Sequence, residues 1–146
     1  MNGIRVRPVE IRGHCPAGLT PESEFQINGM NLVHANDFPL CFLSFSHLPP
    51  SVWQLQSGER FFAHVSCPGC TTRLDEENRV IFLLGHADKW DLCQVISEYR
   101  RMIREHPESK KARQLRLEAM QAQANGDFLL ATRKMLAAVS TFRKVK

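Results

Sequence analysis

The segment FFAHVSCPGCTTRLDEENRVIFLLG, residues 61–85, joins two strand-like runs through a loop that contains two cysteines. Residues 61–66 and 79–85 are rich in aromatic and β-branched side chains, which favours β-strands. The loop begins with Cys67-Pro68-Gly69-Cys70 and carries the acidic run Asp75-Glu76-Glu77. The segment therefore predicts a long-looped β-hairpin with both cysteines exposed at its neck and a solvated acidic tip.

Strand-like alternation also precedes this hairpin. Residues 3–12 alternate along their length, and Pro8 predicts an edge position or a bulge, because proline cannot donate to a strand ladder. Residues 24–28 and 30–33 flank Asn28-Gly29, which is a strong signal for a hairpin turn. The first part of the chain is therefore expected to be rich in antiparallel strands.

Residues 34–60 have a less regular pattern. Residues 40–48 are apolar and aromatic and end at Pro49-Pro50. We expect short helices on both sides of this proline pair, with Ser51 capping the second helix and Ser57-Gly58 ending it.

The hydrophobic period changes from 2 to 3.6 residues after Asp88, which predicts helices to the end of the chain. Asp88 is expected to cap the first helix, which ends near His106-Pro107. The second helix is expected over residues 107–124, with Leu115, Ala119 and Ala122 facing inward. Asn125-Gly126-Asp127 predicts a helix stop followed by a new cap. The third helix carries an apolar stripe that indicates core packing, formed by Phe128, Ala131, Met135, Ala138 and Phe142.

These patterns predict an α+β protein. Its first domain, residues 1–86, is small, antiparallel and β-rich with one or two short helices. Its second part, residues 87–146, is a three-helix extension. Residues 1–96 carry 7 basic and 10 acidic residues, whereas residues 97–146 carry 12 and 5, so the helical part is strongly basic. The two parts are therefore expected to present different surfaces.

The sequence predicts a cytoplasmic protein with reduced thiols. The first residues have no continuous apolar region of the kind that a secretory signal needs. No run approaches the roughly 20 apolar residues that span a bilayer. The chain has 5 cysteines, and an odd number is unusual for a secreted disulfide framework.

Four cysteines form the candidate site: Cys15, Cys41, Cys67 and Cys70. A proline after Cys67 and a glycine before Cys70 allow the tight turn in which two thiolates can bind one metal ion. Because a second C-x-x-C pair is lacking, Cys15 must complete the site together with Cys41 or a histidine such as His14 or His64. Zinc accepts any of these sets, and an iron–sulfur cluster prefers four cysteines.

Two other roles for these thiols stay open. They can be buried small hydrophobic residues with no cofactor at all, as we expect for Cys93 inside its amphipathic helix. A redox pair at Cys67 and Cys70 is the third alternative, although a thioredoxin-type pair begins a helix and no helix is expected here. No phosphate-binding loop, zinc-protease motif or nucleophile elbow is present, so the sequence favours binding over catalysis without excluding an enzyme.

Residues 4–85 resemble a family of short, uncharacterised prokaryotic proteins with a C-P-A-G … C … C-P cysteine pattern. The matching residues are Cys15-Pro16-Ala17-Gly18, Phe25, Leu40-Cys41, Leu48-Pro49, Gly58 and Cys67-Pro68. The chain departs from the family at residues 22–25, where a glycine-aspartate pair is usual, and Cys70 lies outside the pattern. The resemblance implies one small domain and directs attention to Cys15, Cys41 and Cys67, but it implies no activity.

Residues 107–144 resemble a single tetratricopeptide-like helix hairpin through Gly126-Asp127-Phe128 and Ala131. This resemblance implies an αα-hairpin that packs on a partner or on its own domain.

The functional prediction is a small zinc- or iron–sulfur-binding accessory protein whose basic helical tail docks on a protein partner. The alternatives are a metal-free module that forms homo-oligomers through the C-terminal helices and a cysteine-dependent redox enzyme. Nucleic-acid binding is disfavoured, because no stacking aromatic side chains interleave with the basic residues Arg100, Arg101, Arg104, Lys110, Lys111, Arg113 and Arg116.

Overall fold

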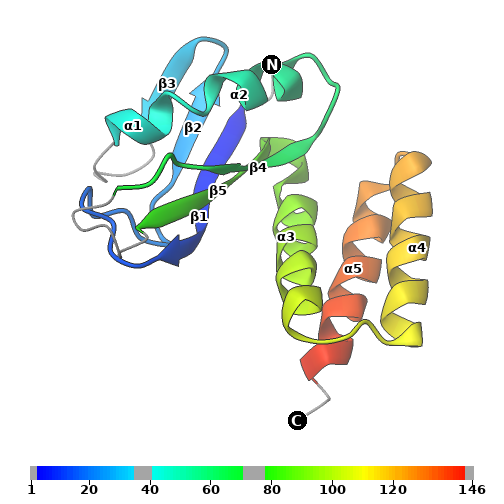
Figure 1. Ribbon diagram of the computed structural model, residues 1–146. Coiled ribbons are helices and arrows are strands. Elements are labelled where there is room, and N and C mark those ends of the chain that lie inside the picture. The colour runs from blue at the N-terminus through cyan, green and yellow to red at the C-terminus, as the bar shows by residue number, and fades with distance from the viewer. Residues whose placement is uncertain (1–2, 35–40, 71–77, 144–146) are drawn as a thin grey trace. The chain divides into compact units, whose positions relative to one another are not determined.

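The computed structural model describes residues 3–34, 41–70 and 78–143. The chain forms two compact units, residues 1–88 and 89–146. The described part of the first unit contains five strands and two short helices, and the second unit contains three longer helices (Figure 1). The α+β class predicted from the sequence is therefore confirmed.

A five-stranded sheet with the order β3-β2-β1-β5-β4 forms the first unit. Each pair of neighbouring strands is antiparallel. The strands are β1 (Ile4–Arg12), β2 (Phe25–Asn28), β3 (Asn31–His34), β4 (Phe62–Ser66) and β5 (Arg79–His86). The first strand of the chain therefore lies in the middle of the sheet, beside the last one.

Both predicted hairpins are confirmed. Asn28 pairs with Asn31 across the β2–β3 turn. Gly29 has φ 60°, a conformation that glycine adopts without strain. The β4–β5 hairpin has the long loop expected, and its acidic run 75–77 lies outside the described residues.

Pro8 produces the bulge that its chemistry predicts. The register of β1 against β5 shifts between Pro8 and Glu10. The predicted alternative, an edge strand, is wrong for β1 as a whole, because β1 lies between β2 and β5. On the β2 side, however, pairing covers only Ile4 to Val6. Pro8 lies beyond these pairs, so the N–H that it lacks removes no hydrogen bond between β1 and β2.

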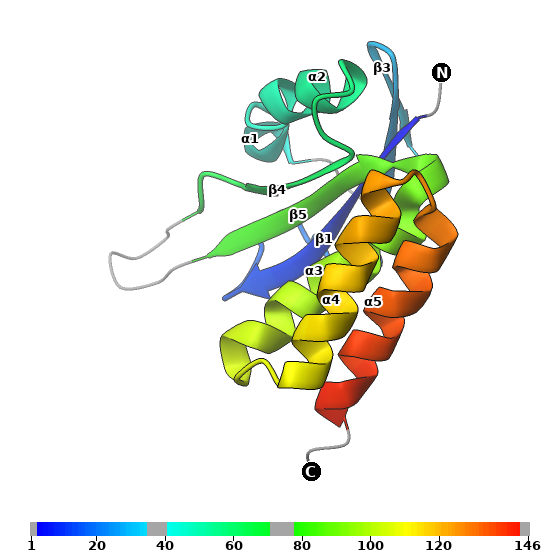
Figure 2. The same ribbon diagram turned by 90° about the vertical axis from the view of Figure 1, so that its right-hand side faces the viewer.

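Two short helices, α1 (Phe42–Phe45) and α2 (Pro49–Gln56), lie over one face of the sheet (Figures 1 and 2). The predicted cap at Ser51 is wrong, because the proline pair occupies the first turn of α2 and Leu48 is the N-cap residue. Proline suits this position, because the N–H groups of the first helical turn have no hydrogen-bond partner within the helix, so the N–H that proline lacks is not needed there.

One hydrophobic cluster joins these helices to the sheet. It includes Val52 and Leu55 of α2 and Leu48 directly before that helix, and its strand members include Phe25 and Phe82. Cys67 belongs to this cluster, and Cys15 and Cys41 pack against it. Three of the four candidate thiols are therefore fixed to the core of the first unit.

The second unit contains α3 (Trp90–Glu105), α4 (Lys110–Ala124) and α5 (Phe128–Arg143). The predicted cap at Asp88 is wrong, because a 3-10 turn covers Ala87–Lys89 and Lys89 occupies the N-cap position. Ser109 caps α4 by accepting a hydrogen bond from the amide of Ala112. The predicted helix stop and restart are confirmed: Gly126 has φ 78°, and Asp127 accepts a hydrogen bond from the amide of Leu130.

Small side chains line the contact between α4 and α5. The predicted inward residues Ala119, Ala122, Ala131, Met135 and Ala138 are buried, together with Ala112 and Val139. Leu115, Phe128 and Phe142 are only half-buried. In the part of the chain that the structure describes, no helix is long and apolar enough to cross a membrane.

Tyr99 of α3 is expected to titrate at unusually high pH. Burial raises the pKa of this phenol to about 12, and its hydrogen bond to the Glu108 carboxylate acts in the same direction. Because the pKa of Tyr99 in the folded protein exceeds its ordinary value of 10.0, the protonated phenol stabilises the folded state. This contribution to folding stability is complete below pH 10 and is lost as pH rises through 12. The loss amounts to about 2–3 kcal/mol.

Tyr99 is the only tyrosine in the chain, so tyrosinate absorbance measures its ionisation directly. We expect a midpoint near 12 in the folded protein and near 10 in denaturant. A folded-state midpoint near 10 contradicts the burial and the bond to Glu108.

Candidate functional site

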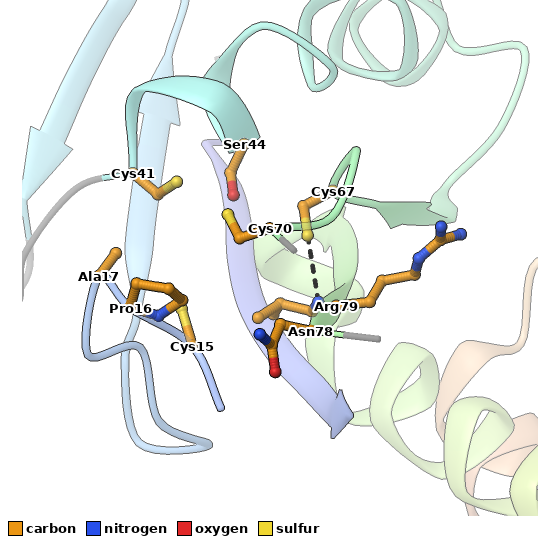
Figure 3. Close-up of a pocket in the computed structure, with 10 residues that line it drawn as sticks. Cys15, Pro16, Ala17, Cys41, Ser44, Cys67, Cys70, Asn78 and Arg79 are labelled. Atoms are coloured by element: carbon orange, nitrogen blue, oxygen red, sulfur yellow. Dashed lines mark hydrogen bonds between the residues drawn. The ribbon is translucent and has the colours of Figure 1, made fainter. Parts of the chain in front are cut away.

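The four candidate cysteines line a single cavity of about 250 Å³ in the first unit. In Figure 3 the Cys41 and Cys70 side chains point towards each other, and Cys15 and Cys67 reach the same cavity from other segments. The remaining lining residues are Pro16, Ala17, Ser44, Asn78, Arg79 and Val80. All five cysteines of the chain are free thiols. The fold therefore brings together thiols that are up to 55 positions apart in the sequence.

The Cys67–Cys70 turn continues the β4–β5 ladder. The amide of Cys67 donates to the Val80 carbonyl, and the amide of Cys70 donates to the Asn78 carbonyl, each at 2.9 Å. Gly69 has φ 91°, and a Cβ added there would lie 3.4 Å from the Asn78 carbonyl oxygen. A side chain at this position would therefore strain the backbone that places the two sulfur atoms.

The predicted exposure of both thiols at the loop neck is wrong for Cys67. Its residue surface is only 8% exposed, because Cys67 belongs to the hydrophobic cluster of the first unit. Cys70 is half-buried. The turn thus presents one thiol from the core and one nearer to solvent.

Asn78 holds the Cys15 turn against this loop. Its side-chain Oδ1 accepts a hydrogen bond of 2.8 Å from the amide of His14, which is 64 positions away in sequence. The Cys15 turn itself is closed by a bond from the Gly18 amide to the Cys15 carbonyl. Asn78 is buried, and sequence analysis did not single it out. The sequence pattern that could have indicated its role was an amide side chain directly before an apolar strand.

Cys41 lies immediately before α1, and its carbonyl accepts a hydrogen bond from the amide of Phe45. Burial raises the pKa of its thiol, but the buried Ser44 hydroxyl and the nearby amides of Ser44 and Leu43 stabilise the thiolate. Together they bring the pKa below its ordinary value of 9.0.

Cys70 shows the opposite shift. Burial is the largest cause that raises the pKa of its thiol, and repulsion from Cys41, Cys67 and Cys15 raises it further. The sulfur atoms are therefore close enough to repel one another when they ionise. A bound cation offsets this repulsion, because its positive charge lies among the thiolates that form when metal binding displaces the thiol protons.

A backbone amide is directed at one of the sulfur atoms. The amide of Val80 donates to Cys67 Sγ at 3.1 Å, drawn as the dashed line in Figure 3. Such a bond stabilises sulfur when it carries negative charge, either as a free thiolate or as a metal ligand. The structure therefore supplies charge stabilisation to a thiol that is otherwise in apolar surroundings.

The two shifted thiols are expected to react with alkylating agents in a fixed order in the metal-free protein. The thiolate is the nucleophile, so a lowered pKa keeps Cys41 reactive below pH 9 and a raised pKa delays Cys70 to higher pH. Iodoacetamide labelling across a pH series, with peptide mass spectrometry, measures both profiles. The fully buried Cys93 serves as the unreactive control. Earlier labelling of Cys70 than of Cys41 contradicts this order.

The other candidate ligands lie elsewhere. His14 and His64 are exposed, and neither lines the cavity. Cys93 is fully buried within α3, as expected for a small core residue. Among residues 3–34, 41–70 and 78–143, no three His, Cys, Asp or Glu side chains converge closely enough to hold one metal ion. The four thiols instead surround the cavity described above.

Two of the basic residues considered for nucleic-acid binding are engaged by carboxylates. Arg101 pairs with Glu98 at 2.7 Å, and Arg116 pairs with Glu108 at 2.7 Å. Glu108 also accepts the Tyr99 hydroxyl, so Arg116 is part of a helix-to-helix network. These contacts give the two arginines a local structural role.

Comparison with known proteins finds no matching family model, no matching curated protein and no matching solved structure.

Proposed function

We propose that the protein binds a metal centre through Cys15, Cys41, Cys67 and Cys70 and acts as a binding or accessory protein. The observation that carries this proposal is the single cavity that all four thiols line. Buried cysteines used only for packing have no need to meet, whereas these four come from three separate segments of the fold. The basic helical unit would dock on a protein partner with an acidic surface.

The residues present suit a metal centre. Thiolate is the ligand that zinc and iron–sulfur clusters prefer. The amide aimed at Cys67 Sγ and the mutual repulsion felt by Cys70 both favour bound positive charge among the sulfur atoms. The tight turn at Gly69 and the Asn78 side chain hold the loops at which the ligands lie. When bound, the metal would join these loops.

Elemental analysis of anaerobically purified protein tests the proposal. We expect zinc or iron at or above one equivalent per chain, lost on treatment with acid and a chelator. Protein that contains neither metal, and that takes up neither after incubation with zinc or with iron and sulfide, contradicts it.

A second candidate function, self-association through the helical unit, rests on exposed apolar side chains. On α4 and α5 these are Leu117, Met120, Leu129, Leu130 and Leu136. In a two-fold dimer the same apolar patch can meet its own copy. Sedimentation velocity over a concentration series tests this candidate, and a monomer at every concentration contradicts it. A Leu129→Glu variant should shift a dimer towards monomer.

A further inference from the structure

The cavity among the four thiols has a definite size, and that size bears on the kind of metal centre. A zinc ion bound by four cysteines lies about 2.3 Å from every sulfur atom. Such a site has no free volume, since the sulfur atoms enclose only the ion. In this chain the same four residues, together with six others, line a cavity of about 250 Å³, and no three of the described His, Cys, Asp or Glu side chains lie close enough to hold one ion. The thiols would have to move together considerably before they could share one zinc ion.

A cavity of about 250 Å³ is much larger than the space that one metal ion fills. The inorganic core of a cubane iron–sulfur cluster contains eight atoms, four of iron and four of sulfide, and so fills more space than one ion. Each iron binds one cysteine thiolate at a corner of the core, so the four sulfur ligands surround a space. The number of thiols and the space between them both suit this arrangement.

The walls of the cavity suit it as well. Pro16, Ala17 and Val80 contribute apolar side chains between the cysteines. Figure 3 shows the Arg79 side chain extending away from the sulfur atoms. The Val80 amide donates to Cys67 Sγ, and hydrogen bonds to ligand sulfur atoms are among the contacts that tune iron–sulfur clusters. The lining of the cavity is mostly apolar, although the cavity is partly open to solvent.

We infer that the metal centre is a cubane cluster of four irons and four sulfides, ligated by Cys15, Cys41, Cys67 and Cys70. This inference rests on the proposed function, because it specifies which centre the four thiols bind. It also gives each of the four cysteines one iron, so that Cys70 is a ligand although the cysteine pattern of residues 4–85 does not include it.

Anaerobic reconstitution of the full chain with ferrous iron and sulfide tests the inference. We expect about four irons and four acid-labile sulfides per chain, with the broad visible absorption of sulfide-to-iron charge transfer. Cys70→Ala should lose this absorption. Cys93→Ala, which removes a thiol from the helical unit, should retain it.

A parallel titration with zinc, and with cobalt as its spectroscopic substitute, separates the possible results. One tightly bound zinc per chain, with tetrathiolate cobalt absorption and no cluster assembly, overturns the inference but leaves the proposed function standing. Two irons and two sulfides per chain also overturn it, because the nuclearity is then wrong. Failure to bind any of these metals overturns the inference and the proposed function together.

Discussion

Chelation of the proposed metal centre is expected to lower the melting temperature of the first unit by about 15–30 °C. A ligand at one thousand times its dissociation constant stabilises the folded state by about 4 kcal/mol. For a unit of this size each kcal/mol changes the melting temperature by about 4–8 °C. The expected effect is large because the thiols belong to three segments, which the proposed metal would join. Pulsed hydrogen exchange with mass spectrometry resolves the two units during heating, and residues 89–146 should be unaffected.

Cysteine variants provide the controls for this experiment. Cys67→Ala should melt at the lower temperature whether or not metal is supplied, with metal affinity reduced by more than about a hundredfold, the upper range for outer residues of metal sites. Cys93→Ala should keep the full metal response, because Cys93 lies in α3. An equal fall in the melting temperatures of both units, or no change in either on chelation, contradicts the assignment of the metal to these thiols.

Phe82→Ala is expected to destabilise the first unit by about 3–5 kcal/mol, which is the usual cost of removing a buried phenylalanine. Phe82 is 1% exposed and belongs to the same hydrophobic cluster as Cys67. Since total stabilities of small domains are about 5–15 kcal/mol, this loss is a large fraction of the whole. The variant should therefore also lose most of its metal at 37 °C.

Phe42→Ala is the matched control, because Phe42 on α1 is 86% exposed. Its stability should change by less than about 0.5 kcal/mol. Urea denaturation of both variants, followed by circular dichroism, measures the difference. Similar stability losses in the two variants contradict the core described for the first unit.

Local patterns in the sequence predicted the elements well where a single periodicity dominates. The hairpin of residues 61–86 and the turn at Asn28-Gly29 follow from alternation and turn chemistry alone. The errors at Ser51 and Asp88 concern helix starts, where several neighbouring residues can provide the first turn. At Pro49-Pro50 the proline ring begins a helix as readily as it ends the preceding run.

The sequence predicted which residues form the candidate site but could not show that they meet, for a physical reason. The residue types at Cys15, Cys41, Cys67 and Cys70 indicated thiol chemistry, but their meeting depends on strand pairs distant in sequence. Placement of Cys15 needs β1 to pair with β5. It also needs the side-chain oxygen of Asn78 to accept a hydrogen bond from the amide of His14. A buried amide side chain that bridges two loops has no local pattern. For the same reason the cavity itself has no signature in the sequence.

The central position of β1 has a consequence for synthesis on the ribosome. Ile4 pairs with His86, so β1, the first strand to be synthesised, cannot form the middle of the sheet until β5, the last strand, has been synthesised. Contacts so distant in sequence form late, because the intervening loop must close first. Cys15 and Cys41 therefore emerge from the ribosome well before Asn78 and β5 can enclose them. Under the proposed function, loading of a metal centre would therefore follow completion of the first 86 residues, and the nascent thiols would stay open to oxidation until then.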